Sequence, residues 1–340
     1  MRKSETGFLR KLWGFALVSV ALVATLAACG GEEEKPTITI IDGNWTSVNV
    51  LGEVAAKVIT EQLGYPTERL RTDVTPGWAA LCEGDADVAV EAWLPGRLPE
   101  IQPFIDQGCV ELGGTNFPGG IGWFVPAYVI EGDASRGIDP MAPGLKDITD
   151  LNEYWELFEN PENPGKGEIL GGDPGWIDHP DDISRIKGYE LNYYRSNQGE
   201  AVIQARVKAA VLKGEPILFY LWTPHSFFGE VDTIQIGEPD PYDPAKCFLP
   251  LENGEPHTGE LPYRCAHAAY DVRTAIRTEV KETAPDVANL IENMYFSEKG
   301  VSDIMYQVDV LERDVAEVVD EWIAAHQSDI DAWIAGNRTD

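Results

Sequence analysis

Apolar residues along the chain recur with two different periods, which predict an alternation of strands and helices. Residues 37–41 are short and β-branched, which predicts a strand, and apolar residues then recur at helical spacing across 51–59 until Leu63 and Gly64 end the pattern. Two more strands are predicted at 69–74 and 87–93, with a short helix at 78–81 between them. This alternation predicts an α/β fold with a mostly parallel sheet.

A second set of elements follows an extended apolar run at residues 122–130. Residues 232–263 are rich in Pro, Asp and Gly and predict a long loop, after which 265–272 is extended. The remaining chain is predicted to be helical. The other predicted elements are helices at 145–158, 181–194, 200–212, 315–323 and 330–334 and strands at 168–171 and 216–222.

The N-terminus has the pattern of a secretory signal. Basic residues within 2–11 precede an uncharged stretch at 12–28, which is marginal for a membrane span of about 20 residues. The stretch ends in Leu26-Ala27-Ala28-Cys29-Gly30 and resembles the bacterial lipobox. We therefore expect residues 1–28 to be removed, Cys29 to be lipidated and 29–36 to form a tether outside the cytoplasm. An uncleaved membrane anchor is the alternative.

The chain is strongly acidic, with 57 Asp and Glu against 26 Lys and Arg and a formal charge of −31 over 340 residues. Without residues 1–28 the charge would be −34. Such a surface repels phosphate backbones and anionic lipid head groups, which excludes nucleic acid as a partner and leaves the lipid as the contact with the membrane. The charge is compatible with a saline habitat and equally with a general need for solubility.

Four cysteines remain once Cys29 is assigned to the lipid. An even number in an oxidising compartment predicts two disulfides, although four cysteines allow three connectivities. Proximity in the sequence favours Cys82 with Cys109 and Cys247 with Cys265. A zinc site is the weaker interpretation, because the chain has no C-x-x-C pair.

Motifs for catalysis, metals and cofactors are missing from the sequence. It contains no P-loop, HExxH, GxSxG or EF-hand pattern, and its five histidines are scattered without a spacing that suggests a shared metal. We therefore predict no catalytic residue, no metal and no cofactor.

The most informative feature of the composition is its high tryptophan content, with ten in the chain. Four of them, Trp45, Trp93, Trp176 and Trp222, lie where a predicted strand ends or a loop begins. Open α/β sheets bind ligands in the crevice at these strand ends. A quaternary ammonium ion offers no hydrogen-bond donor, so its charge is best met by aromatic faces, each worth about 2 kcal/mol when desolvated.

Each tryptophan has a structural alternative as a core residue. Core packing is the better interpretation for Trp155, Trp322 and Trp333, which lie on predicted helical stripes. The pattern does not decide whether Trp78 and Trp123 belong to the core or to a ligand site.

Several motifs together resemble the glycine-betaine-binding proteins of osmoprotectant ABC importers. These are GDADVAVEAWLP at 84–95, DPGW at 173–176, EPILFYLWTPH at 215–225, and the tryptophan-containing stretch 322–334. The resemblance covers about 37–334. It implies a periplasmic-binding-protein type II fold in which two α/β lobes, joined by a two-segment hinge, close on a ligand in the cleft. Lobe I would comprise 37–124 and 263–340, and lobe II would comprise 125–262.

The resemblance also implies a ligand cage. In one branch of the family its walls correspond to Trp93, Trp176 and Trp222, whereas a second branch uses the position of Trp45 in place of Trp176. This chain has both, so either four indoles form the cage or one lies behind it.

The family also holds the ligand's carboxylate, through backbone amides that correspond to Ile177 and Asp178 and through a histidine. Arg97 stands at the histidine's position; a surface arginine that balances the acidic charge is the alternative. A helix N-terminus suits an anion. His225, which ends the 215–225 run, completes the candidate ligand-binding residues.

The resulting hypothesis is a lipid-anchored, monomeric solute receptor that delivers glycine betaine, or a related betaine, to ABC permease subunits. A choline-binding or dimethylsulfoniopropionate-binding protein is the alternative within binding proteins. An enzyme acting on such compounds is the alternative from another class, and the missing motifs argue against it.

Overall fold

The computed structural model describes residues 35–247 and 258–339. The predicted signal, Cys29 and tether residues 29–34 lie outside the described residues. Within the described ranges, no helix is long and apolar enough to cross a membrane.

Nine strands in the described residues form one sheet, in the order β2-β1-β3-β9-β4-β7-β5-β6, with β8 paired to β4. We call its first part the first half-sheet. There β1 (Ile38–Asp42) pairs in parallel with β2 (Thr67–Arg71) and β3 (Val88–Leu94). Strand β9 (Tyr270–Arg277) lies antiparallel between β3 and residues 110–119 of β4 (Val110–Pro126).

The second half-sheet begins where β4 leaves β9. From Gly120 onward β4 pairs antiparallel with β7 (Phe219–Thr223) and β8 (Thr233–Gln235). Strand β5 (Gly167–Gly171) is parallel to both β7 and β6 (Tyr193–Asn197). The predicted division into lobes at residues 124 and 262 stays a prediction.

The expectation of a mostly parallel sheet is wrong. Among the described strands, four pairs are antiparallel and four are parallel, and each antiparallel pair includes β4 or β9. The physical reason is the path of the chain. Strand β4 runs from the first half-sheet into the second and β9 returns beside it, so two neighbouring strands that cross the same junction must run in opposite directions.

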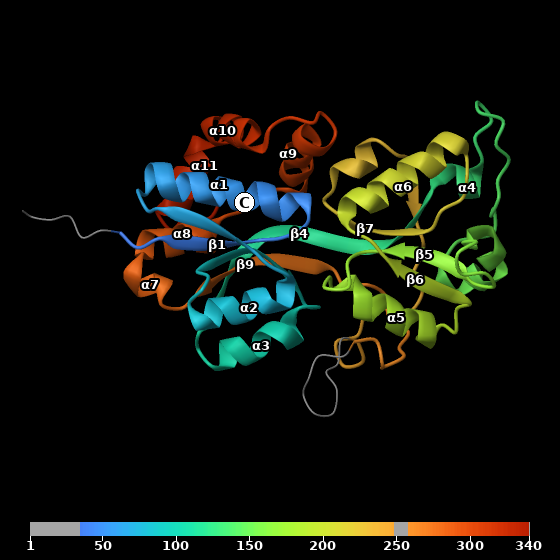
Figure 1. The fold of residues 1–340 in the computed structure, drawn as a ribbon, viewed down its shortest axis with the longest axis horizontal. Coiled ribbons are helices and arrows are strands. Elements are labelled where there is room, and N and C mark those ends of the chain that lie inside the picture. Colours follow the sequence, from blue (N-terminus) through green and yellow to red (C-terminus); the bar gives the residue numbers. More distant parts are fainter. Residues whose placement is uncertain (1–34, 248–257, 340) are drawn as a thin grey trace, which may run out of the picture. The chain divides into compact units, whose positions relative to one another are not determined.

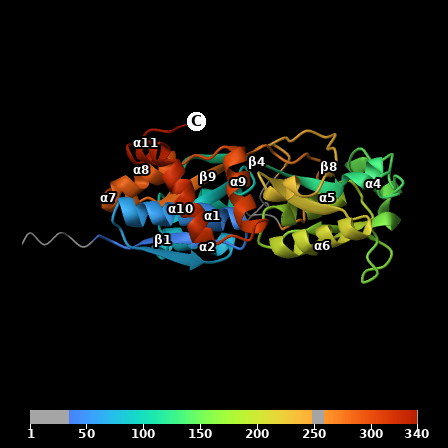
Figure 2. The same ribbon diagram turned by 90° about the horizontal axis from the view of Figure 1, so that it is seen from above.

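Helices cover both faces of each half-sheet (Figures 1 and 2). In the first half-sheet α1 lies on one face and α2 and α3 on the other, and in the second half-sheet α6 and α5 are divided in the same way. The C-terminal helices α8–α11 gather on the side of α1. The α-helices are α1 (Thr46–Lys57, extended by a π-turn at Val58–Gln62), α2 (Val74–Glu83), α3 (Leu98–Asp106), α4 (Ala127–Glu131), α5 (Asp178–Gly188), α6 (Glu200–Lys213), α7 (Val280–Thr283), α8 (Pro285–Asn293), α9 (Glu298–Asp309), α10 (Val315–Ala325) and α11 (Gln327–Ile334).

Most predicted elements are confirmed in type, but several are wrong in type or extent. The extended segment predicted at 265–272 begins as a strand only at Tyr270 and continues to Arg277, where the sequence predicts a helix. The predicted strand 69–74 ends at Arg71, and the predicted loop 232–263 contains β8. The 181–194 helix stops at Gly188, and Tyr193 and Tyr194 belong to β6. Residues 145–158 form two 3₁₀-helices, Ile148–Glu153 and Trp155–Phe158. The apolar run 122–130 is half strand and half α4. This run contains no polar residue at the point where the strand changes to a helix, so its apolar pattern does not mark the change.

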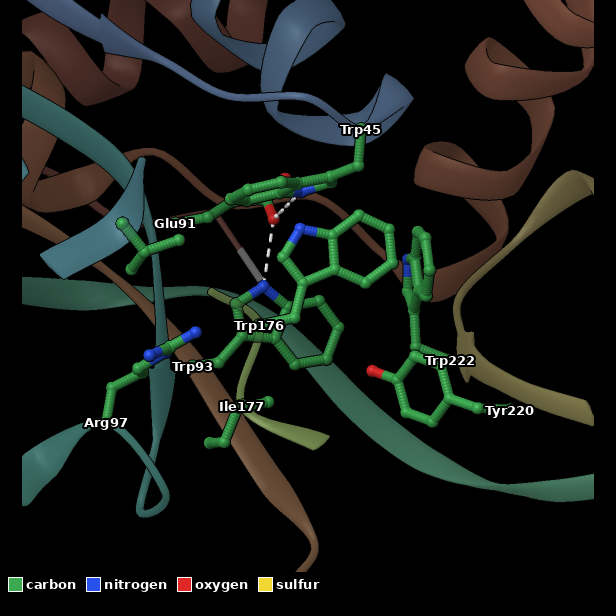
Figure 3. A pocket seen from close by; sticks show the side chains of 9 residues that line it. Trp45, Glu91, Trp93, Arg97, Trp176, Ile177, Tyr220 and Trp222 are labelled. Carbon is green, nitrogen blue, oxygen red and sulfur yellow. Dashed lines mark hydrogen bonds between the residues drawn. The ribbon is translucent and has the colours of Figure 1, made fainter. Parts of the chain in front are cut away.

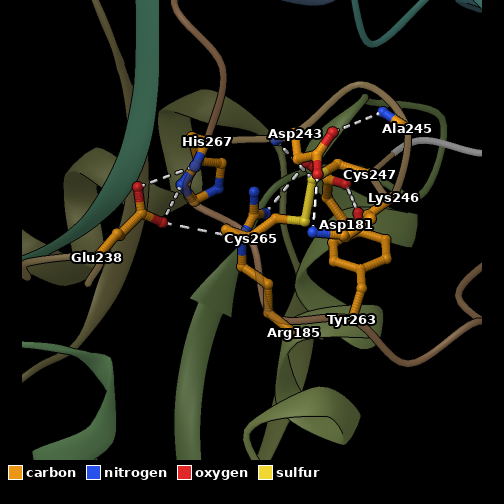
Figure 4. Close-up of a disulfide and its surroundings, with 10 residues drawn as sticks. All are labelled: Asp181, Arg185, Glu238, Asp243, Ala245, Lys246, Cys247, Tyr263, Cys265 and His267. Atoms are coloured by element: carbon orange, nitrogen blue, oxygen red, sulfur yellow. Dashed lines mark hydrogen bonds and ion pairs between the residues drawn. A yellow bond between two sulfur atoms is a disulfide. The ribbon is translucent and has the colours of Figure 1, made fainter. Parts of the chain in front are cut away.

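Both disulfides have the expected partners. Cys82 near the end of α2 is bonded to Cys109 beside β4, and Cys247 is bonded to Cys265 (Figure 4).

The structure also shows which of the remaining tryptophans belong to the core. Trp78, Trp123 and Trp333 are buried, while Trp155 and Trp322 are half-buried against the main core.

Candidate functional site

A cavity lies where the carboxyl ends of β3 and β7 meet the starts of α1 and α5 (Figure 3). It holds about 430 Å³ of empty volume, its open mouth included. The two half-sheets both contribute to it. Its lining consists of Trp45, Val74, Glu91, Trp93, Arg97, Trp176, Ile177, Tyr220 and Trp222.

Glu91 holds two of the indoles. Its Oε2 accepts a hydrogen bond from Trp45 Nε1 at 2.8 Å and another from Trp93 Nε1 at 2.9 Å. Both rings are therefore fixed in orientation by one carboxylate, as the dashed lines in Figure 3 show. Burial raises the pKa of Glu91 to about 7. The hydrogen bonds from the two indoles lower this pKa, and the negative charge of Glu200 raises it further.

Trp176 is placed by the turn that precedes α5. Asp173 caps this turn, since its Oδ1 accepts from the Gly175 N–H at 2.9 Å and its carbonyl accepts from the Trp176 N–H at 2.9 Å. The indole Nε1 of Trp176 donates to Asn44 Oδ1 at 2.8 Å. The ring lies edge-on to Trp45 and to Trp222, with centroids 6.1 Å and 5.2 Å apart.

Trp222 and Tyr220 share one face of β7, since residues two apart in a strand point the same way. Their ring centroids are 6.1 Å apart, and both rings line the cavity. Burial raises the pKa of Tyr220 well above its ordinary value, so its hydroxyl stays a hydrogen-bond donor at every physiological pH.

The amides of Ile177 and Asp178 open α5. Within the described part of the chain, neither N–H has a hydrogen-bond partner, as expected at a helix start. The Asp178 carboxylate accepts from the Gly172 N–H at 3.0 Å and is paired with Arg195, which also pairs with Asp182 at 3.0 Å. Arg195 thus balances the buried carboxylates and leaves the helix start suited to an anion.

Arg97 is buried at the edge of the cavity. Its Nη1 donates to Glu100 Oε1 at 2.8 Å and its Nη2 donates to the carbonyl of Gly175, the residue before Trp176. Arg97 therefore connects the loop after β3 with the turn before α5. The alternative of a solvent-facing arginine does not hold in this structure, because the residue is only 6% exposed.

The loop after β3 approaches Ile177 at the start of α5 so closely that a side chain at residue 96 would require a shift of Ile177 or of the loop. A Cβ added to Gly96 would lie 1.8 Å from Ile177 Cδ1. The glycine thus permits the contact between the two half-sheets beside the cavity.

His225 does not line the cavity. Its Nδ1 accepts from the Phe227 N–H at 3.1 Å, which places the ring proton on Nε2, 2.9 Å from Glu200 Oε1. The imidazole centroid lies 4.8 Å from that of Trp222. The structure therefore places His225 against the Trp222 ring and outside the cavity lining.

The structure brings together six of the eight predicted ligand-binding residues in the cavity lining: Trp45, Trp93, Arg97, Trp176, Ile177 and Trp222. Asp178 borders the cavity through its helix start, and His225 stands outside it. Sequence reasoning missed Glu91, Tyr220 and Val74. The strand period contained a signal for two of them, because Glu91 and Tyr220 each lie two residues before a predicted cage tryptophan.

Residues 36–325 match the family model described as the substrate-binding domain of the ABC-type glycine betaine transport system. The chain belongs to this family. Two curated relatives are the glycine betaine/proline betaine-binding periplasmic protein of Escherichia coli, 26% identical over 81% of this chain and 82% of the relative, and a glycine betaine-binding periplasmic protein of Dickeya dadantii, 24% identical over 82% and 83%.

Solved structures of similar fold include an ABC-transporter choline-binding protein with choline and a lactococcal protein of the same family with glycine betaine. The first has a TM-score of 0.69 at 21% identity and covers 89% of this chain and 93% of its own. The second has a TM-score of 0.66 at 18% identity and covers 88% and 100%. The predicted type II periplasmic-binding-protein fold is thereby confirmed.

Proposed function

We propose that this member of the family binds glycine betaine, or a closely related betaine, in the cavity between the four indoles and releases it to an ABC permease. The observation that carries the proposal is the convergence of Trp45, Trp93, Trp176 and Trp222 on one cavity. Aromatic faces attract a quaternary ammonium, which has no N–H to donate. All four indoles are therefore cage walls in this proposal.

The other end of the cavity suits a carboxylate. Arg97 adds a permanent positive charge there, and the free N–H groups of Ile177 and Asp178 point from the start of α5. Tyr220 adds a hydroxyl. A zwitterion with a short spacer between its charges matches this arrangement better than a simple cation does.

Titration of a ligand panel by calorimetry tests the proposal. Glycine betaine, proline betaine, dimethylsulfoniopropionate and choline are added to the protein, and glycine betaine is expected to bind in the micromolar range. Trp93→Ala, Trp176→Ala and Trp222→Ala should each weaken binding at least tenfold, since a desolvated aromatic face exceeds the ~1.4 kcal/mol of one decade. Replacement by Phe should cost less.

Trp155→Ala is the matched control, because Trp155 is half-buried and lies outside the cavity. The affinity of this variant for glycine betaine should stay within twofold of that of the unmodified protein. Unchanged affinity in two of the three cavity variants would assign those indoles to the core alone. No detectable binding of any compound would refute the proposed ligand class.

The proposal includes no chemistry. The protein acts as a monomeric receptor outside the cytoplasm that leaves its ligand unchanged, so incubation with glycine betaine should yield no new product by mass spectrometry. The curated relatives are periplasmic proteins by name, which supports this compartment.

We also propose a lipid anchor at Cys29, supported by the Leu26–Cys29 motif after the apolar run. In a bacterial host, the unmodified protein should partition with membranes and carry the mass of an acylated Cys29. Cys29→Ser should abolish both. If the variant stayed in the membrane fraction with unchanged mass, residues 12–28 would be an uncleaved anchor instead.

A further inference from the structure

Glu91 is the acidic side chain of the cavity lining, and it is buried beneath two indoles. One oxygen, Oε2, receives both indole N–H groups. Arg97 lines the same cavity, but its guanidinium is engaged by Glu100 and by the Gly175 carbonyl. The cavity therefore has one carboxylate next to the indoles of Trp45 and Trp93 and one guanidinium next to the start of α5.

Two physical effects make this carboxylate act on a bound cation. The first is direct attraction, which is strong where water is excluded. The second acts through the rings, because an N–H that donates to an anionic acceptor polarises its indole and makes the ring faces more negative. Both effects require Glu91 to be ionised, whereas orientation of the rings needs only a hydrogen-bond acceptor.

Resting on the proposed function, we infer that Glu91 is the anionic component of the cage, a carboxylate that orients Trp45 and Trp93 and makes the site select permanent cations over uncharged molecules of the same shape. In a bound betaine the ammonium group lies toward Glu91 and the carboxylate toward Arg97. The pair thus determines which way round the ligand binds.

The charged groups around Glu91 set the conditions for its ionisation. Glu200 at the start of α6 opposes it, and Asp42 of β1 lines a smaller cavity together with Glu91 but is paired with Arg69 at 2.9 Å. His225 stands beside Glu200, and Arg97 faces the shared cavity. A bound cation favours the carboxylate form, so affinity rises as the pH passes upward through about 7 and then levels off.

The test compares Glu91→Gln with Glu91→Ala in calorimetric titrations at pH 8. The glutamine oxygen still accepts both indole N–H groups, so this variant removes the charge and keeps the anchor. Choline and its uncharged carbon isostere 3,3-dimethylbutan-1-ol are the paired probes. In Glu91→Gln the preference for choline over the isostere is expected to fall at least tenfold, with the affinity for the isostere unchanged within twofold.

Glu168→Gln is the matched control. Glu168 is a buried carboxylate of β5, paired with Arg206 outside the cavity, so the same change of charge there should leave the choline preference unaltered. A further measurement needs only the unmodified protein. Near pH 7 choline binding should release part of a proton, measured as a dependence of the binding heat on buffer ionisation, and the release should fade toward pH 9.

The possible failures are distinct. If the unmodified protein binds no quaternary ammonium compound, the proposed function fails. If it binds them, while Glu91→Gln keeps the full preference and choline releases no proton at pH 7, the anionic role of Glu91 is refuted. In that case a loss in Glu91→Ala alone would leave Glu91 as an uncharged anchor for the two rings.

Discussion

The family resemblance implies a carboxylate-binding histidine at the position of Arg97, and in this structure Arg97 also joins two loops. A guanidinium is always charged and can grip both oxygens of a carboxylate, so its contact with an anion does not depend on pH. The bond to the Gly175 carbonyl means that the side chain also positions the turn that holds Trp176.

The Arg97→Ala variant can distinguish the loop contact from the charge, because the two losses should affect glycine betaine and choline differently. Loss of the loop contact should weaken glycine betaine and choline alike. Loss of the charge should weaken glycine betaine alone, by a further tenfold or more, because a charge-assisted hydrogen bond is worth about 1.5 to 3 kcal/mol. We expect the ratio of the two dissociation constants to shift by that factor in calorimetric titrations.

Arg136→Ala, which removes an arginine outside the cavity lining, should leave the ratio unchanged. An equal loss for both ligands in Arg97→Ala would make the α5 amides the anion site and Arg97 a purely structural link.

At the scale of elements, the loop after β3 and the turn before α5 meet at Gly96 and Ile177. Gly96→Ala would place a methyl group 1.8 Å from Ile177 Cδ1, so Ile177 would have to turn into the cavity or the two loops would have to separate. We expect this variant to weaken glycine betaine at least tenfold by calorimetry. Adding Ile177→Ala should recover part of the loss, since it removes the obstructing atoms.

Gly229→Ala is the matched control, because a Cβ at Gly229 meets nothing within 4 Å. Its affinity should equal that of the unmodified protein. If Gly96→Ala bound as tightly as the control, the contact between the loops would not matter for the site.

The Cys247–Cys265 disulfide stabilises a different part of the second half-sheet. It anchors the segment before β9 over α5, where the Cys265 carbonyl accepts from Arg185 Nε at 2.8 Å and Arg185 pairs with Asp181 at 3.1 Å (Figure 4). Closing a loop of 18 residues restricts the unfolded chain by about 3 kcal/mol.

Replacing both cysteines by alanine should therefore lower the free energy of unfolding by about 3 kcal/mol in denaturant titrations. Ligand affinity should stay the same, because neither cysteine lines the cavity. A stability equal to that of the unmodified protein would show that the packed segment needs no covalent constraint.

At the scale of the whole molecule, the formal charge of −31 is the feature with the largest expected effect on stability. Like charges over one surface repel each other and oppose the compact state, and salt shortens their range from about 10 Å at 0.1 M to about 3 Å at 1 M. We expect the melting temperature to rise by several degrees between 0.05 M and 1 M salt. NaCl and KCl should act equally, as screening does not distinguish the cations. A constant melting temperature would mean that repulsion does not limit stability.

The sequence by itself determined the α/β class, most of the elements and the residues that face the cavity from strand ends. The signals that it contains are local: the period of apolar residues, the turn residues before and after each strand, and the aromatic residues Trp93 and Trp222 at the ends of two predicted strands. The pairing of the four cysteines followed from short separations. Family resemblance then related Trp176, Ile177 and Arg97 to one ligand.

Only the tertiary structure decided the direction of β9, the place of His225 and the hydrogen-bond partners of Glu91. Each depends on residues far apart in the chain: β9 on the strand that it returns beside, His225 on Glu200, and Glu91 on Trp45, 46 positions away. A sequence pattern shows which side chains are apolar and with what spacing they recur along the chain. It does not record which carboxylate two distant indoles will meet, because that follows from how the strands and helices pack.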